Sequence, residues 1–453
     1  MKLRSTLIIL GICALMLISG VVIWATHDEA PLDYSSMDIE IGPKDASING
    51  YTRLQEIADE YDFSAISGLN VNPFVAYPAL PQVELAARLQ EYEPTIQLID
   101  DAFGRELFLY DQKVNLQTVF TETKTMTLYN FAVCLKSRQQ AIDGDPDAAL
   151  KTLQDQLAKI ERLSQAGGGI FNTIISAGML NFTSQEIQYL ISNYPLSRES
   201  LSEFLKNYPE HGRLLAAAAN SATYEFQLAK GAFTDLTQDP ASIYDTASSE
   251  KTALKPLASA LYKPNATINW AYQIFLEHQQ QLSLPLKDHE YPAMERLQQL
   301  ADKKSQDTLT KYLDSNITGH IALLLCIPTL DGATRNLYKI ELVSRVTYLL
   351  AALRLYQMDH QSLPTKLSDL VPAYIPSIPA DPFDGQPIRY DAERAVLYSV
   401  GIDFIDNGGN SYPSRLDDPD SQAKSKFIAE RYQEEPTYHI RFDLEPRTFE
   451  RAE

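Results

Sequence analysis

The sequence is short of cysteine and of positive charge, and each shortage excludes a class of protein. Three cysteines in 453 residues cannot build the disulfide framework of a small secreted domain. Cys134 and Cys326 lie in apolar stretches, where two buried thiols or a single bridge between them are the alternatives. The 39 lysines and arginines face 59 aspartates and glutamates, a formal net charge of -20. Because nucleic-acid phosphates would be repelled by this charge, we expect no nucleic-acid partner.

The sequence also lacks the motifs of the common hydrolases and nucleotide-binding proteins. No His-Glu-x-x-His, Gly-x-Ser-x-Gly or Walker sequence occurs. Residues 248–251 and 421–424 spell Ser-x-x-Lys, but the companion motifs of that enzyme class do not follow. Residues 143–147 imitate the start of an EF-hand loop, but Ala148 stands where glycine is needed. We therefore assign no catalytic residue from the sequence.

The N-terminal segment has the pattern of a membrane-spanning helix. Basic residues precede a run, residues 6–25, that contains no ionisable side chain other than Cys13. Such a run reaches about 30 Å as a helix, the thickness of a bilayer core. The basic flank is expected to stay in the cytoplasm, and Trp24 lies where interfacial aromatics are favoured. The predicted anchor residues are Thr6, Leu10, Leu15, Ile18, Val22 and Trp24.

A cleaved signal peptide is the alternative explanation of this segment. Its apolar region would be about 7–15 residues long and would end in a small-x-small site. The run here is longer and ends in Ile23-Trp24-Ala25, where two bulky residues make a poor cleavage site. The residues favour an anchor, with the bulk of the chain outside the cytoplasm.

Beyond an anchor and stub over residues 1–27, the chain divides into three parts by pattern. Residues 28–50 carry proline and glycine with little periodicity, and we predict a linker. Residues 51–328 show successive helical periods without a fixed repeat, which indicates an irregular helical bundle. Residues 329–453 are predicted to hold one long helix and a small antiparallel sheet. The predicted fold class is therefore mainly α, with a C-terminal α+β module.

Local signals predict several element boundaries in the helical domain. Asp145 and Pro146 have the residue types of a helix N-cap and first helical position. Ser197 is a second candidate N-cap. Pro94 is expected to end a helix. Residues 231–264 are rich in proline and small polar residues, and we expect a long loop there.

The C-terminal module begins with a predicted amphipathic helix over residues 334–360. Residues 388–390 and 395–400 have strand character and are expected to pair as a hairpin. Residues 438–442 alternate as a further strand. One helix followed by such a sheet is an α+β arrangement.

Four turn motifs follow this helix in a characteristic order. Ser-Leu-Pro, Asp-Pro-Phe-Asp-Gly, Tyr-Ser-Val-Gly-Ile-Asp and Asp-Asn-Gly-Gly occupy residues 362–364, 381–385, 398–403 and 406–409. Over about residues 340–410, this order resembles the C-terminal region of the major pseudopilins of bacterial type II secretion. The whole chain resembles uncharacterised bacterial envelope proteins that join an N-terminal anchor, a helical middle and this module.

The resemblance implies a calcium-binding loop behind the hairpin. Calcium takes six to eight oxygen ligands from carboxylates, amides and carbonyls, and Asp403 falls on the family's motif. The candidate ligands are Asp403, Asp406, Asn407, Asn410, Asp417 and Asp418. A plain turn capped by its own Asp and Asn side chains is the alternative.

Anchor, bundle and module together predict a single-pass protein of the bacterial inner membrane, with its bulk in the periplasm or otherwise outside the cytoplasm. We expect an interaction or scaffold protein with an unidentified envelope partner, and the resemblance implies a connection to secretion. An extracytoplasmic hydrolase with an acidic site outside the known motifs is the alternative. Buried carboxylates with raised pKa in a cleft of the helical domain would favour that hydrolase.

Overall fold

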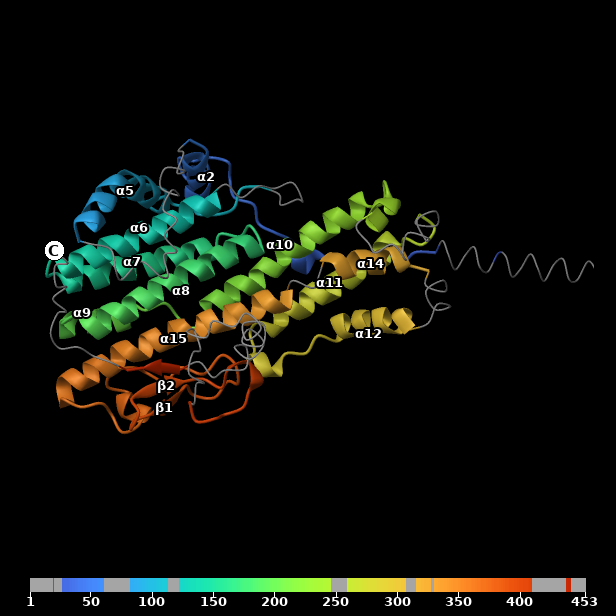
Figure 1. Ribbon diagram of the computed structural model, residues 1–453. Coiled ribbons are helices and arrows are strands. Elements are labelled where there is room, and N and C mark those ends of the chain that lie inside the picture. Colours follow the sequence, from blue (N-terminus) through green and yellow to red (C-terminus); the bar gives the residue numbers. More distant parts are fainter. Residues whose placement is uncertain are drawn as a thin grey trace, which may run out of the picture.

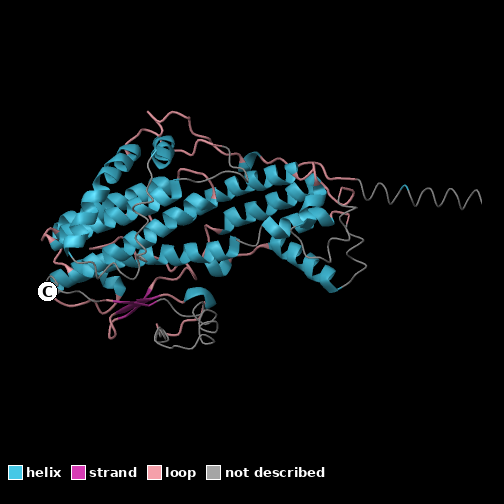
Figure 2. Ribbon diagram, turned by 45° about the horizontal axis from the view of Figure 1, so that its top comes forward, coloured by secondary structure: helices cyan, strands magenta, loops and turns pink. Residues whose placement is uncertain are grey.

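The structure, a computed structural model, is mainly helical with one small antiparallel sheet (Figures 1 and 2). It describes residues 19, 27–60, 82–112, 122–245, 259–306, 315–326, 330–409 and 437–440. The α-helices of these residues are α2 (Gly50–Glu60), α5 (Gln82–Phe103), α6 (Glu122–Ile142), α7 (Pro146–Ser164), α8 (Ile170–Asn193), α9 (Arg198–Lys206), α10 (Arg213–Asp235), α11 (Pro264–Gln281), α12 (Pro292–Gln306), α14 (Ile317–Cys326) and α15 (Leu330–His360). The predicted fold class is confirmed at this level.

The predicted anchor residues Thr6, Leu10, Leu15, Ile18, Val22 and Trp24 lie outside the described residues. Among the helices that are described, none is long and apolar enough to cross a membrane.

The molecule is elongated, and most helices follow its long axis (Figure 1). Helices α5 to α9 form one half, α11, α12 and α14 form the other end, and α10 runs from one half into the other. Helix α15 packs against α8 and α9, and the sheet lies beside α15. Helix α15 confirms the long helix predicted over residues 334–360. It lies between the bundle and the sheet.

One hydrophobic core runs across the boundary predicted at residues 328 and 329. It joins Leu150 of α7 and Leu190 of α8 to Leu349 of α15, and continues to Phe383 and Leu397 of the C-terminal module. Each of these side chains is at most 1% exposed. The helical domain and the module are therefore packed as one body, because α15 presents apolar side chains to both.

Cys134 lies in this core as a buried free thiol, so the bridged alternative is not formed.

The two helix N-caps predicted from the sequence are confirmed. The Asp145 carboxylate accepts from the Ala148 amide at 3.0 Å, with Pro146 at the first helical position, and the Ser197 hydroxyl accepts from the Ser200 amide at 3.1 Å.

The boundary predicted at Pro94 is wrong, because α5 continues through it. The proline removes one main-chain hydrogen bond. Tyr92 before it and Ile96 and Ile99 after it are all buried in a single core that also takes in α2 and α6. Burial of one helix face on both sides of the proline outweighs the local preference to end the helix.

The segment predicted as a linker is instead packed along the bundle. Asp28 accepts hydrogen bonds from the Asn265 and Ala266 amides, and so caps the N-terminus of α11. Met37 is fully buried beside residues of α10 and α11. Asn49 pairs with Leu107 in an isolated bridge. Such contacts have no helical or strand period, so no sequence pattern predicts them.

The predicted hairpin is confirmed. Strands β1 (Arg389–Asp391) and β2 (Val396–Tyr398) are antiparallel, with Tyr390 opposite Leu397. Strand β3 (Thr437–His439) pairs antiparallel with β2 on its other side, with Tyr438 opposite Leu397. Leu397 is fully buried, which fixes the register because a one-residue slip would expose it.

Candidate functional site

The candidate site lies where the Asp-Pro-Phe-Asp-Gly turn meets the loop behind β2. In the turn, the Asp381 carboxylate accepts from the Phe383 amide at 3.0 Å and the Asp381 carbonyl accepts from the Gly385 amide at 2.8 Å. Gly385 has φ of +75°, a conformation that favours glycine. Arg345 of α15 donates to the Ala380 carbonyl at 2.7 Å and so ties the turn to the bundle. The predicted turn is confirmed.

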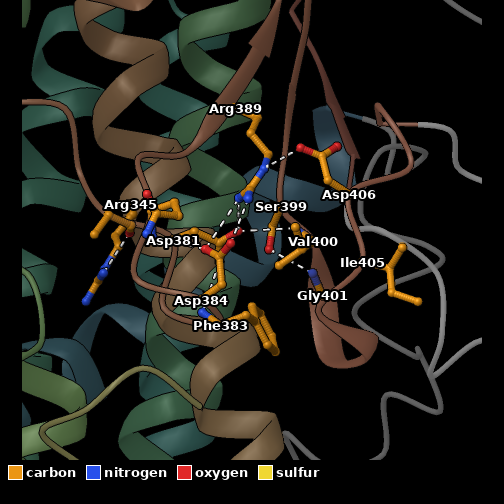
Figure 3. Close-up of polar contacts among 12 residues, drawn as sticks. Arg345, Asp381, Phe383, Asp384, Arg389, Ser399, Val400, Gly401, Ile405 and Asp406 are labelled. Atoms are coloured by element: carbon orange, nitrogen blue, oxygen red, sulfur yellow. Dashed lines mark hydrogen bonds and ion pairs between the residues drawn. The ribbon is translucent and has the colours of Figure 1, made fainter. Parts of the chain in front are cut away.

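The guanidinium of Arg389 is surrounded by three carboxylates (Figure 3). Its nitrogens lie 3.1 Å from Asp381, 2.6 Å from Asp384 and 2.9 Å from Asp406. The Asp381 side chain is fully buried, whereas that of Asp406 is 48% exposed. We call these four residues the Arg389 cluster. With all four groups ionised, it carries two negative charges more than its arginine balances.

Burial and hydrogen bonding set the charge states of the three acids. Burial raises the pKa of Asp381 and outweighs the hydrogen bonds that Asp381 accepts. Partial burial also acts to raise the pKa of Asp384, but hydrogen bonds from Arg389 and the Gln386 amide hold it below its ordinary value. A hydrogen bond from the Gly408 amide lowers the pKa of Asp406. Asp384 and Asp406 are therefore the firmly ionised partners of Arg389.

The loop predicted to bind calcium is stabilised by its own backbone where it is described. The Asp403 carboxylate accepts from the Ile405 amide at 3.1 Å, and that of Asp406 from the Gly408 amide at 2.9 Å. Gly401, Gly408 and Gly409 have φ between +68° and +73°, as their predicted role in turns requires. These bonds fit the alternative of a capped turn.

Only part of the predicted calcium-ligand set lies within the described residues. Asn407 is exposed beside Asp406, whereas Asn410, Asp417 and Asp418 lie outside the described residues. Over the part of the chain that is described, no three His, Cys, Asp or Glu side chains are grouped as metal ligands would be. Calcium binding therefore stays a prediction. The sequence does not predict the Arg389 cluster, because residues 381–385 have only the pattern of a turn and Asp406 is distant from them in the chain.

A calcium titration of stability tests the loop. If Asp403 is a ligand, calcium at about 100 times its dissociation constant should stabilise the purified full chain by about 2.7 kcal/mol over the same protein in excess chelator. Asp403→Ala should abolish this gain. Asp288→Ala, which removes an exposed carboxylate elsewhere, should retain it. Superimposable melts of the unsubstituted protein with calcium and with chelator would leave the loop as a capped turn.

Buried carboxylates also occur in the helical domain, where the hydrolase alternative would need them. Glu122 is 1% exposed and accepts from the Tyr51 hydroxyl at 2.6 Å, and burial raises its pKa. Glu186 is 5% exposed and forms a bidentate salt bridge with Arg138. Glu225 accepts from the Ile170 amide at the start of α8. Glu122 and Glu186 are buried, and Glu225 is half-buried. All three are bonded to neighbouring groups of the fold, which explains them as structural groups.

Comparison with known proteins adds no assignment to these sites, because no family model, curated protein or solved structure matches the chain. The pseudopilin resemblance of residues 340–410 therefore stays a prediction.

Proposed function

We propose that this chain is a single-pass protein of the bacterial inner membrane whose extracytoplasmic bulk acts as an interaction or scaffold protein of the envelope. The observation that carries the interaction role is an exposed apolar tip, Phe404 and Ile405, behind β2. Their side chains are 41% and 57% exposed. Exposed apolar groups that a rigid framework holds in place are typical of protein-binding surfaces.

The framework under this tip is well defined. Phe404 has φ of +60°, a left-handed conformation that costs a non-glycine residue about 1–2 kcal/mol. The two flanking acids hold the backbone there, because Asp403 accepts from the Ile405 amide and Asp406 pairs with Arg389. Strain retained at an exposed apolar residue favours a role in binding over a role in folding.

The anchoring part of the proposal rests on the uncharged run over residues 6–25. The first residues described after it lead directly to the end of the molecule that α11 and α14 form (Figure 1), where Asp28 caps α11. An anchor would therefore join the elongated body at that end. The sheet lies beside the other half of the long axis (Figure 1), and the apolar tip follows its strand β2 in the chain.

The hydrolase alternative receives less support. A general acid or base must come within hydrogen-bonding reach of its substrate. Burial raises the pKa of Glu122, Glu186 and Glu225 in the helical domain, where the first two are buried and the third is half-buried. Their bonds to Tyr51, Arg138 and the Ile170 amide explain them as structural groups.

Site-specific cross-linking in cells tests the proposal. A photoreactive phenylalanine analogue in place of Phe404 should give a discrete adduct with an envelope protein in the membrane fraction. The same analogue at Leu284, which is also 41% exposed and lies outside the tip, is the matched control and should not. Adding Ile405→Asp should lower the adduct yield about tenfold or more, because binding would then bury an unpaired carboxylate.

Deletion of residues 1–26 should move the protein from the membrane fraction to the soluble fraction, and this tests the anchor separately. Equal adduct yields at Phe404 and Leu284 would contradict the binding tip. Membrane association that persists after the deletion would contradict the anchor.

A further inference from the structure

A groove of about 510 Å³ lies between the helical domain and the C-terminal module. Its walls come from α9 and the segment after it, from α15, and from residues 373–376. Ligand sites are commonly about 300–1,000 Å³ and form where two packed units meet. We call it the α9–α15 groove. Its aromatic and positively charged lining residues are Arg198, Lys206, Tyr208, His211, Tyr348 and Tyr374.

One wall of the groove is aromatic and carries polar atoms without partners. The ring centroid of Tyr348 lies 5.3 Å from that of Tyr208 and 5.0 Å from that of His211. Tyr208 is fixed by donating to the Ser344 carbonyl at 2.9 Å. In contrast, the Nδ1 atom of His211 is buried with no hydrogen-bond partner among the described residues. This atom is shielded from solvent, so a ligand in the groove would meet the imidazole at its other ring nitrogen.

The imidazole of His211 is uncharged at neutral pH. Burial, helped by the charge of Arg345, lowers the pKa of His211 to about 4. One of its ring nitrogens therefore accepts a hydrogen bond while the other donates one. The hydroxyl of Tyr348 can do both, and in the described structure it bonds to no other group. This wall suits a ligand with several hydroxyl groups.

The charged residues that line the groove leave one positive charge unbalanced. Arg198 pairs with Asp359, whose carboxylate also accepts from the Tyr374 hydroxyl at 2.7 Å. The one lining carboxylate, Glu210, lies 3.2 Å from Arg213. Lys206 is exposed at the end of α9, and no described acidic side chain pairs with it. The balance of charges favours a ligand with a single negative charge.

The shape of the groove argues against a peptide chain. Extended peptides pair with a sheet edge and helical ones enter apolar channels. The described lining consists of helices and a turn, with no strand, and mixes polar with apolar groups. A dianionic phosphate ligand would bring more negative charge than the one free lysine balances.

We propose that the α9–α15 groove binds a carboxylated sugar. Its carboxylate would pair with Lys206, its hydroxyls would bond with the Tyr348 hydroxyl and the His211 imidazole, and its ring would lie against the tyrosine side chains. This site is separate from the Phe404–Ile405 tip, so it stands or falls independently of the interaction role.

Titration calorimetry of the purified full chain tests the site with glucuronate, glucose and glucose 6-phosphate at millimolar concentrations. Glucuronate should bind more tightly than either of the others. Lys206→Gln should weaken glucuronate binding about tenfold or more, because it removes a charged hydrogen-bond donor. Tyr348→Phe should also weaken it, by removing a single hydroxyl. Lys151→Gln, an exposed lysine of α7 outside the groove, is the matched control and should bind as the unsubstituted protein does.

Three results would overturn the proposal. The first is the absence of any heat of binding with glucuronate. The second is a competitor that matches it, either glucose bound equally tightly or glucose 6-phosphate bound more tightly. The third is glucuronate binding that is unchanged in both Lys206→Gln and Tyr348→Phe. Thermal unfolding of each variant shows whether it still folds. A variant that loses glucuronate binding but unfolds at the same temperature as the unsubstituted protein would support the site.

Discussion

Replacing Arg138 with alanine is expected to destabilise the protein by about 3–5 kcal/mol, because it leaves the Glu186 carboxylate buried and unpaired. The two side chains are 6% and 5% exposed, and both hydrogen bonds between them are 2.7 Å long. The guanidinium carbon also lies 3.7 Å from the ring centroid of Tyr189. Denaturant unfolding of the purified protein measures the loss.

The pair itself need not add stability. Exchanging both partners for apolar residues, Arg138→Met with Glu186→Leu, should restore most of the loss, since neither charge would then be buried. Lys151→Ala is the matched control, because its pair with Asp155 at 3.1 Å is more than half exposed on both sides and should cost about 0.5 kcal/mol or less. A loss in Arg138→Ala no larger than in Lys151→Ala would contradict the assigned role.

The pH dependence of this loss has a definite sign. Burial raises the pKa of Glu186 above its ordinary value, and replacing Arg138 removes the charge and the hydrogen bonds that oppose that rise. A raised pKa means that the unfolded chain releases its proton first as the pH increases. The stability difference between Arg138→Ala and the unsubstituted protein should therefore be smallest below the ordinary glutamate pKa and should grow as the pH rises.

Phe383→Ala is expected to cost about 3–5 kcal/mol, the usual loss for a fully buried phenylalanine. The side chain is 0% exposed, and its ring centroid lies 6.4 Å from that of Tyr338 in α15. The core that holds Phe383 continues into α7, α8 and the first half of α10. Trp270, in α11, packs against a second cluster that includes the other half of α10. Because α10 joins the two clusters, we expect the loss to reach Trp270.

The expected result, with Trp24 replaced by phenylalanine so that Trp270 is the one remaining tryptophan, is that fluorescence and helical circular dichroism show the same lowered midpoint in Phe383→Ala. Met358→Ala, at an exposed position of α15, is the control and should change stability by about 0.5 kcal/mol or less. A Trp270 midpoint that stays in place while the module unfolds would mean that the cluster around Trp270 unfolds separately from the core that holds Phe383.

Local chemistry was enough to predict most of the secondary structure. Asp145 and Ser197 cap helices because an oxygen on a short side chain can reach a free amide within its own turn, wherever the helix later packs. The hairpin of β1 and β2 followed in the same way from a strand pattern on each side of a short turn. Pro94 shows the limit, since its local preference was outweighed by contacts with α2 and α6.

The sequence by itself determined the charge balance, the helical composition, the helix caps and the presence of a small antiparallel sheet, because each depends on residues that are neighbours in the chain. Only the tertiary structure decided that residues 28–50 pack along the bundle and that α15 joins two predicted domains into one core. It also brought Asp381, Asp384 and Asp406 around Arg389, and Lys206 within the same groove as Tyr348. These groupings join side chains that are distant in the sequence, and no local pattern encodes which of them will meet when apolar faces are buried.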